Sequence, residues 1–479
     1  MQRAPAGRIV ERLRTWPTAV TFTRRQTSWT PHECRGVGGA AALNDMSAAV
    51  PVLDALLAGT WPDPDGGPPI EVPVVAVAIE RSLAGHEAEL LAPLPLGRRL
   101  AVVSDRTTRA VLGKRVERAL AARGTVIPVV LDGLPHADAP TVATVRRACA
   151  TADALVAVGS GTINDLCKYA AASDGKPYVA FATAPSMNGY TSTNAAITVD
   201  GHKKSLPAAA ALGVFIDLTV FSRAPARMIR AGLGDSLCRS TAQADWQLSH
   251  HLLDTPYRQA PFALLADDEP LLLKHPEALL AGDFDAMAAL ARTLVLSGLG
   301  MTIAHGSYPA SQGEHLISHY IDMFAPSGRA SHFHGEQVAV ATLTMARIQE
   351  AMLDGEPPHV QPSSVTCADL QGRFGGDIGA SCWREFETKR MTRDAAAGLE
   401  RRAGATWDEL RARLRRDMIP AATIAAVLAR AGCPTTPADI GLTPAFYAAA
   451  VRNARFLRDR YTFLDLADDG GRLGALWPA

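Results

Sequence analysis

The chain has 479 residues, which at roughly 150 residues per domain suggests two or three domains with cores of their own. Lys plus Arg equals Asp plus Glu at 48 each, so the sequence lacks the excess positive charge expected of a nucleic-acid-binding protein. With 48% hydrophobic and 20% charged residues, the composition is that of a globular protein and excludes disorder over most of the chain.

The seven cysteines are widely spread and never form a CxxC pair. This pattern predicts neither a disulfide framework nor a zinc ribbon, and it favours a reducing cytoplasm. The longest uncharged apolar stretch, 293–304, is too short to span a bilayer. We therefore expect a soluble protein without a membrane span.

Residues 1–45 are rich in Arg and poor in acidic residues, and they show no apolar periodicity. Such a composition is typical of a transit peptide, but it also fits a misassigned start with Met46 as the true first residue. We interpret the segment as a poorly ordered leader or a misassigned start and expect it to contribute nothing to the fold.

From residue 99, short β-branched runs alternate with helical stretches. The predicted strands are 100–105, 126–131, 154–159, 178–183 and 214–218, and the predicted helices are 108–123, 141–151 and 162–172. Nearly continuous apolar strands that alternate with helices indicate a parallel sheet covered on both faces. We predict an α/β, Rossmann-like dinucleotide-binding domain over 46–223.

After about Ala224 the strand signal disappears. Long stretches with helical periodicity follow, namely 234–253, 284–299, 313–324, 335–352, 406–431 and 443–462. They predict an all-α domain over 224–479. A cleft between an α/β and a helical domain is a preferred place for a ligand.

The turn after the third predicted strand reads GSGTIND over 159–165 and opens a predicted helix. Small residues let the backbone approach a ligand closely, and a helix N-terminus offers unpaired N–H groups to a pyrophosphate. The spacing is not GxGxxG, so an ordinary Rossmann fingerprint is not met. A tight connection without a ligand is the alternative interpretation.

Asp105 ends the first predicted strand. A carboxylate at this position can accept hydrogen bonds from ribose hydroxyls and repels a 2′-phosphate, which favours NAD(H) over NADP(H). The residue can equally be a turn or helix-cap aspartate.

Four of the thirteen histidines lie in a short region of the helical half. His315 and His319 are four residues apart and share one face of a predicted helix, and His332 and His334 follow in SHFHGEQ. Two imidazoles and a carboxylate are a common set of ligands for a catalytic divalent metal. Spacing does not identify the carboxylate; Asp235 in GLGDSL is one candidate, with helix N-cap as the alternative.

Seven motifs together resemble a known family. They occur in order along the chain and read GSGTINDLCKY, ATAPSMNGYTS, GHKKSLPA, GLGDSLCRSTAQADW, GEHLISH, HGEQV and RYTFLDLA, and the resemblance runs from about Leu56 to Leu473. The chain resembles the bacterial branch of the sn-glycerol-1-phosphate dehydrogenases, within the iron-containing alcohol dehydrogenase and dehydroquinate synthase-like superfamily.

The resemblance implies an NAD(P)-linked dehydrogenase that reduces dihydroxyacetone phosphate, a small phosphorylated substrate, and that forms a homo-oligomer of at least two chains. By position, Asp235, His315 and His334 correspond to ligands of one divalent metal (zinc, nickel or iron), and His319 corresponds to a substrate contact. The positions that correspond to cofactor contacts are Asp105, Gly159, Ser160, Gly161, Thr162, Ile163, Thr183, Ser186 and Ser192. Lys203 and Lys204 correspond to phosphate contacts, with solvated turn lysines as the alternative.

One position departs from the family. Where the family usually has an aspartate that touches the substrate, before the glycine of ATAPSMNGYTS, this chain has Asn188. An amide cannot exchange a proton as a carboxylate does, so the catalytic set of Asp235, His319 and Asn188 can differ from the family in its proton relay or its substrate.

Three other functions are compatible with parts of this pattern. A dehydrogenase of another phosphorylated or phosphonylated small polyol would explain Asn188. A dehydroquinate synthase-like cyclase uses NAD only transiently, but Asp235 stands where we would expect a glutamate in such an enzyme. A non-catalytic binder of metal and nucleotide is favoured by Asn188 alone. Net oxidation of NADH during turnover separates the dehydrogenases from the cyclase.

Overall fold

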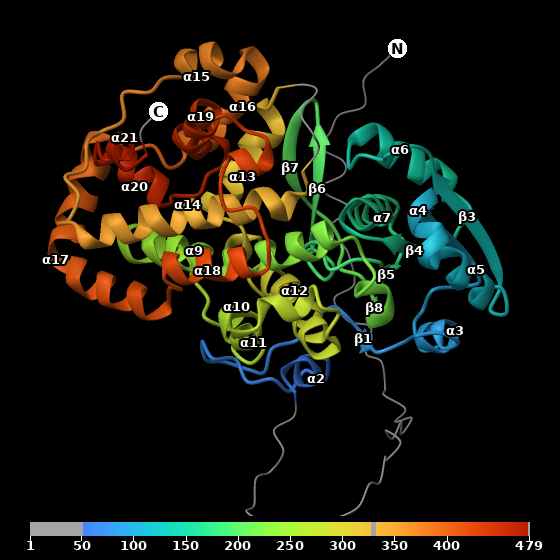
Figure 1. The fold of residues 1–479 in the computed structure, drawn as a ribbon. Coiled ribbons are helices and arrows are strands. Elements are labelled where there is room, and N and C mark those ends of the chain that lie inside the picture. The colour runs from blue at the N-terminus through green and yellow to red at the C-terminus, as the bar shows by residue number, and fades with distance from the viewer. Residues whose placement is uncertain (1–50, 327–331, 478–479) are drawn as a thin grey trace, which may run out of the picture. The chain divides into compact units, whose positions relative to one another are not determined.

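The computed structural model describes residues 51–326 and 332–477, so the predicted leader lies outside the described residues. Six of the described strands form one sheet in the first half of the chain (Figure 1). They are β1 (Ala76–Glu80), β2 (Arg99–Asp105), β3 (Thr125–Leu131), β4 (Ala154–Gly159), β5 (Tyr178–Ala182) and β8 (Gly213–Asp217). Every pairing in this sheet is parallel, as the apolar strands predicted.

The five predicted strands are confirmed as β2, β3, β4, β5 and β8. Sequence reasoning missed the short edge strand β1 and the antiparallel hairpin of β6 (Asn194–Val199) and β7 (His202–Pro207). Lys203 and Lys204 belong to β7 rather than to a turn. The hairpin is a separate two-stranded sheet and is not buried on both faces as the central strands are. Its sequence therefore lacks the continuous apolar run by which the central strands were predicted.

The strand order is β1-β8-β5-β4-β2-β3, and the side on which the chain adds its next strand changes between β2 and β4. From β2 the chain continues outward to β3, whereas β4, β5 and β8 follow on the other side. Ligands of open parallel sheets bind outside the carboxyl ends of the strands at such a switch point. The ends of β2 and β4 are Asp105 and Gly159, two of the predicted cofactor contacts.

Both faces of the sheet are covered, because successive side chains of each strand point to opposite sides. Leu100 and Val102 pack in one apolar cluster with the buried side of α3 (Glu87–Leu91) and α5 (Lys114–Leu120). Ala101 and Val103 pack in another with α6 (Ala139–Ala148) and α7 (Gly161–Asp174). The second cluster continues into the helical half, so the sheet and the helices share a core.

The described chain after β8 is helical. The longer helices are α9 (Ala226–Leu253), α12 (Phe284–Ile303), α13 (Gly313–Phe324), α14 (His334–Asp354), α16 (Gly376–Glu387), α17 (Arg393–Asp417), α18 (Ala421–Arg430) and α19 (Pro444–Asn453). The shorter ones are α2 (Val52–Leu57), α4 (Arg106–Thr108), α8 (Leu218–Phe221), α10 (Ala260–Ala263), α11 (Glu269–Lys274), α15 (Cys367–Phe374), α20 (Phe463–Asp469) and α21 (Leu473–Leu476).

Three predicted helices have different bounds. The predicted helix 443–462 ends at Asn453 as α19, because the next four residues tighten into a 3₁₀ turn and Arg458 is extended. The stretch 406–431 is two helices, because Pro420 lacks an N–H and stands at the N-cap of α18. Helix α9 begins at Ala226, eight residues before the predicted start. Gly232 and Gly234 lower the helix propensity of this stretch, but its packing in the folded protein keeps it helical.

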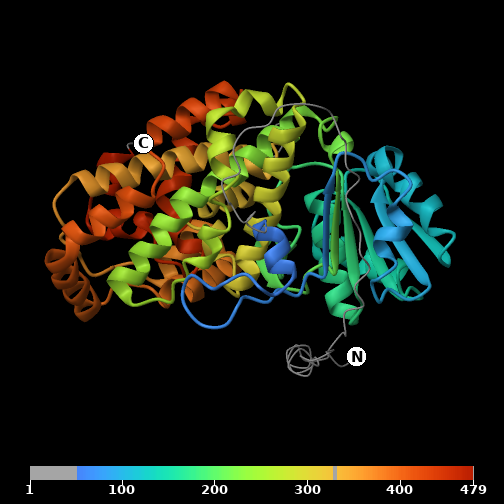
Figure 2. The ribbon, with the colours of Figure 1, turned by 90° about the horizontal axis from the view of Figure 1, so that it is seen from below.

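The segment that contains α2 lies against the helical half (Figure 2). Arg258 forms ion pairs with Asp63 at 2.6 Å and Asp65 at 2.8 Å, and Leu56 is buried in the same cluster as the apolar residues of α12.

Helix α12 is long and apolar enough to cross a membrane, but 89% of its most apolar 18-residue stretch is buried in the protein. It is a core helix.

Helix α9 makes two contacts too close for any side chain. A Cβ atom on Gly232 would lie 1.7 Å from the carbonyl oxygen of Pro185, in the segment after β5. A Cβ atom on Gly335, at the start of α14, would lie 1.9 Å from the carbonyl oxygen of Ala231. These glycines let the backbones touch, which brings the segment after β5 and the first turn of α14 to the same part of α9.

Replacing Gly232 by Ala should therefore destabilise the protein. Overpacking typically costs about 1–3 kcal/mol, and the obstacle here is backbone that cannot turn aside. The control is Gly404→Ala in α17, where the added Cβ meets nothing within 4 Å; removing an exposed helical glycine should stabilise by up to about 1 kcal/mol. Urea unfolding of both variants measures the difference. Equal free energies of unfolding would contradict the described contact.

Candidate metal and cofactor site

Three helices bring Asp235, His315 and His334 together. Asp235 lies on α9, His315 near the start of α13, and His334 is the first residue of α14. The Nε2 atom of His315 lies 3.5 Å from Asp235 Oδ1, and the ring centres of His315 and His334 are 4.9 Å apart. His319, one turn after His315, has its ring centre 6.2 Å from both other imidazoles.

The donor atoms of this group fit a bound cation. Asp235 Oδ1 has only Nε2 of His315 near it, at 3.5 Å, and His319 Nδ1 and the Asn188 NH2 group are buried without a hydrogen-bond partner among the described residues. Buried polar atoms are rarely left unpaired, so a ligand or ion is the expected partner. One carboxylate and two imidazoles suit zinc, nickel or iron. Asp235 and His315 are 1% and 5% exposed, so a cation here would be held away from bulk water.

His315 is oriented by the neighbouring carboxylate. Its Nδ1 lies 3.0 Å from Glu314 Oε1, and Glu314 also accepts hydrogen bonds from the backbone N–H of Gln312 and the hydroxyl of Thr241. Burial opposes a charge on His315, but the hydrogen bonds to Asp235 and Glu314 outweigh it and raise its pKa to about 9. With Nδ1 held by Glu314, Nε2 points towards Asp235.

The other two imidazoles are neutral. Burial lowers the pKa of His334 to about 3 and that of His319 well below its usual range, and the positive charge of Lys203 adds to both shifts. A neutral imidazole is the form that binds a metal. His332 lies two residues before His334, ahead of α14.

Asp235 is also tied to the segment that leaves the sheet. Its Oδ2 atom accepts a hydrogen bond of 2.8 Å from the backbone N–H of Asn188. Sequence reasoning singled out the Asn188 side chain, but it could not foresee this backbone contact, because a main-chain N–H leaves no signal in residue type.

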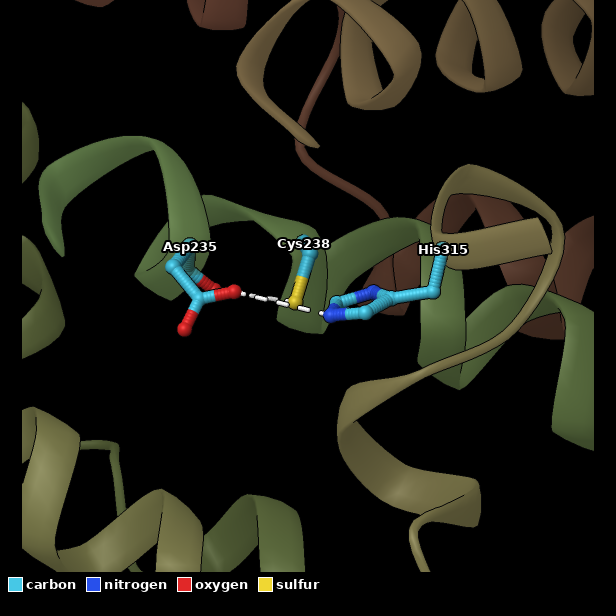
Figure 3. Close-up of side chains that lie close together, drawn as sticks. All are labelled: Asp235, Cys238 and His315. Atoms are coloured by element: carbon cyan, nitrogen blue, oxygen red, sulfur yellow. Dashed lines mark hydrogen bonds and ion pairs between the residues drawn. The ribbon is translucent and has the colours of Figure 1, made fainter. Parts of the chain in front are cut away.

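Cys238, one turn after Asp235, is a neighbour that sequence reasoning missed (Figure 3). Its sulfur and one donor atom each of Asp235 and His315 lie within 4.8 Å of one another. The thiol donates to the carbonyl oxygen of Asp235 at 2.9 Å, and burial raises its pKa well above the usual range. The spacing of three between Asp235 and Cys238 was the available signal.

The predicted cofactor contacts lie at the carboxyl edge of the sheet. Ser160 is the N-cap of α7, and Gly161, Thr162 and Ile163 form its first turn. A Cβ atom on Gly159 would lie 2.5 Å from that of Ile163, so the tight turn requires this glycine.

The segment after β5 connects this edge to the metal ligands. The N–H of Thr183 donates to the carbonyl oxygen of Gly159 at 3.1 Å, and a Cβ atom on Gly161 would lie 3.2 Å from the Met187 side chain. Ser186, 8% exposed, lies in the same segment, which ends at Asn188. The turn that fits a pyrophosphate and the group that fits a metal are therefore connected by a few residues.

Two predicted contacts have structural partners. Asp105 caps α4, since its Oδ1 accepts a hydrogen bond from the Thr108 N–H at 2.7 Å and its own N–H donates to the Thr108 hydroxyl.

The hydroxyl of Ser192 lies 2.9 Å from Nζ of the buried Lys168. Lys168 was missed, although it stands in the motif GSGTINDLCKY; it also donates to the carbonyl oxygens of Gly189 and Asn194 and so fixes this segment to α7.

Two basic residues, Lys203 and Arg458, act on His319 electrostatically. Lys203 forms an ion pair of 2.5 Å with Asp322 on α13, and Lys204 lies next to it on β7. Arg458 contributes to the lowered pKa of His319. Arg458 was also missed; it lies two residues before the motif RYTFLDLA.

The comparisons with known proteins agree with this fold. The family described as iron-containing alcohol dehydrogenase matches residues 78–225. A probable glycerol dehydrogenase from Sinorhizobium meliloti superposes with a TM-score of 0.54 over 84% of this chain and 96% of that one, at 19% identity. The NADH-dependent butanol dehydrogenase A of Thermotoga maritima gives a TM-score of 0.55 at 14% identity, over 86% of this chain and 98% of that one. These structures establish the fold.

Curated relatives are closer in sequence. The glycerol-1-phosphate dehydrogenase (NAD(P)+) of Bacillus licheniformis is 33% identical over 319 residues, which are 63% of this chain and 79% of that protein. The enzyme of the same name from Halalkalibacterium halodurans is 36% identical over 256 residues, 52% of this chain and 64% of the relative.

The curated relatives and the family match define the class: an NAD(P)-linked dehydrogenase of the metal-containing type. Within this class, the chain belongs to the glycerol-1-phosphate dehydrogenase family.

Proposed function

We propose that the chain interconverts dihydroxyacetone phosphate and sn-glycerol 1-phosphate with a nicotinamide cofactor and one divalent metal. The observation that carries the proposal is the convergence of Asp235, His315 and His334 at the end of the segment from the nucleotide edge of the sheet. This arrangement supports hydride transfer between a nicotinamide and a carbon next to the metal ligands.

Asp235 Oδ1 and the Nε2 atoms of His315 and His334 are the atoms that would hold the metal. A divalent metal bound there acts as a Lewis acid on the substrate oxygen and removes the need for a strong protein base. His319 Nδ1 is free to hydrogen-bond the substrate hydroxyl, and Asn188 Nδ2 can donate to a second oxygen. Burial of these side chains keeps water away from the reacting carbon.

The remaining contacts concern the cofactor and the phosphate. The first turn of α7, from Gly161, offers backbone N–H groups and a positive dipole end to a pyrophosphate. Lys203 and Arg458 supply positive charge near His319, which supports an anionic substrate group. On the family resemblance and the cysteine usage, we further infer a cytoplasmic homo-oligomer of at least two chains that binds zinc, nickel or iron.

The metal assignment is tested by two histidine variants. His334→Ala should abolish both bound metal and turnover, because it removes one of three ligands. His319→Ala is the matched variant in the same site; it should retain the metal and lose activity, since His319 faces the substrate. Elemental analysis and net NADH oxidation with dihydroxyacetone phosphate measure the two effects. Full metal occupancy in His334→Ala would refute the assignment, and turnover without net NADH oxidation would indicate a cyclase.

The cofactor preference is tested at Asp105. We expect wild type to prefer NAD(H) over NADP(H), because the Asp105 carboxylate opposes a 2′-phosphate. Asp105→Asn should narrow the preference and preserve the helix cap, since Asn caps as well as Asp. Asp138→Asn, the same change at the cap of α6, is the control and should leave the preference unchanged. Equal use of both cofactors by wild type would show that Asp105 does not lie beside the ribose.

Asn188 favours a second candidate function, a dehydrogenase of another phosphorylated or phosphonylated small polyol. Its buried Nδ2 atom can donate a hydrogen bond that an aspartate cannot, and a substrate acceptor would satisfy it. The two functions share the metal, the cofactor and the fold, so only a comparison of substrates separates them.

For dihydroxyacetone phosphate, Asn188→Asp should raise turnover, because a carboxylate restores a proton relay and such assistance is worth about 10²- to 10⁴-fold. For a substrate that accepts from the Asn188 amide, the same change should lower turnover by leaving the acceptor unpaired. Rates of NADH oxidation with a panel of ketone phosphates distinguish these outcomes. Fast wild-type turnover that the substitution leaves unchanged would show that position 188 does not set the rate.

A further inference from the structure

A row of hydrogen-bonded side chains leads away from His334. Its Nδ1 atom lies 3.2 Å from the hydroxyl of Ser318, and this hydroxyl lies 3.0 Å from Oε1 of Gln337. Nε2 of Gln337 lies 3.0 Å from Oδ1 of Asp322, whose other oxygen pairs with Nζ of Lys203 at 2.5 Å. The row passes from α14 to α13, back to α14 and again to α13, and it ends on β7.

The chemistry of the row fixes its direction. The Asp322 carboxylate, paired with Lys203, can only accept, so Gln337 presents its NH2 group to Asp322 and its oxygen to Ser318. Ser318 therefore donates its single proton to Gln337. The hydroxyl oxygen keeps its lone pairs, so it accepts a hydrogen bond from the Nδ1–H group of His334.

The consequence is one tautomer of His334. The proton is on Nδ1, and the lone pair is on Nε2. A histidine that binds a metal commonly donates its other N–H to a partner that fixes the ring, and removing such a partner typically weakens metal binding about 10- to 100-fold. His315 obtains the same orientation from Glu314 directly, so the two histidines are held by separate networks.

We propose that Gln337 is a positioning residue for the metal, which acts through Ser318 to keep Nε2 of His334 available. The inference rests on the proposed function in that it takes His334 as a metal ligand. Gln337 and Ser318 are 1% and 0% exposed and reach no substrate through this row. Their orientation is set by Asp322, which lies one turn beyond His319 on α13.

The test compares two buried glutamines. Gln337→Met removes both hydrogen bonds at similar side-chain length. Gln247→Met is the matched control, because Gln247 on α9 is 2% exposed and also donates from Nε2 to an aspartate, Asp417, at 2.8 Å, without contact to a site histidine. For each variant, chelator competition gives the dissociation constants of Zn2+ and Co2+, and the visible spectrum of bound Co2+ reports its ligand geometry. Thermal unfolding of the metal-free proteins measures structural damage separately.

Gln337→Met should weaken binding of both metals about 10- to 100-fold and change the Co2+ spectrum, whereas Gln247→Met should bind as wild type. Ser318→Ala should reproduce the loss and serves as the test if Gln337→Met does not fold. Wild-type affinity in both Gln337→Met and Ser318→Ala would overturn the inference, as would an equal loss in Gln247→Met. If His334→Ala also binds metal like wild type, the ligand assignment itself fails; if only His334→Ala loses the metal, the positioning role alone fails.

Discussion

The hydrogen bond from the Asn188 N–H to Asp235 Oδ2 joins the segment that leaves the sheet to the helices that carry the histidines. It leaves Oδ1 facing Nε2 of His315, which is where we propose that a cation binds. The contact depends on the absence of a side chain at Gly232, where α9 touches the carbonyl oxygen of Pro185 three residues before Asn188. Backbone packing thus determines how the nucleotide edge meets the candidate metal site.

The charges around this contact are consistent with a divalent cation. Asp235 and Glu314 place two carboxylates in a buried region, while burial keeps His319 and His334 neutral. Buried charges are costly unless they are compensated. In the structure the raised pKa of His315 offsets part of this negative charge, and in the proposed site a divalent metal beside Asp235 would take over that compensation. Near His319 the neighbouring charges are positive, because Arg458 and Lys203 add to the lowering of its pKa by burial.

The sequence predicted those parts that leave a local pattern. Apolar runs located the central strands to within a residue, and the i, i+4 spacing of His315 and His319 correctly placed them on one helix. Contacts between distant elements have no such pattern: the Lys168 contacts span more than twenty residues, and the Gln337 row depends on how α13 packs on α14. At Asp105 both interpretations from the sequence involve the same carboxylate; the cap is present in the structure, and the ribose contact stays a prediction.

Diffraction at the absorption edge of zinc, from crystals of the zinc-loaded protein, tests the account most directly. The account predicts one anomalous peak per chain, within bonding distance of a carboxylate oxygen of Asp235 and of Nε2 of both His315 and His334. The expected distances are about 2.0–2.2 Å. A peak bound by Nδ1 of His334, a peak bound by the Cys238 sulfur in place of His334, or a peak remote from Asp235 would contradict it.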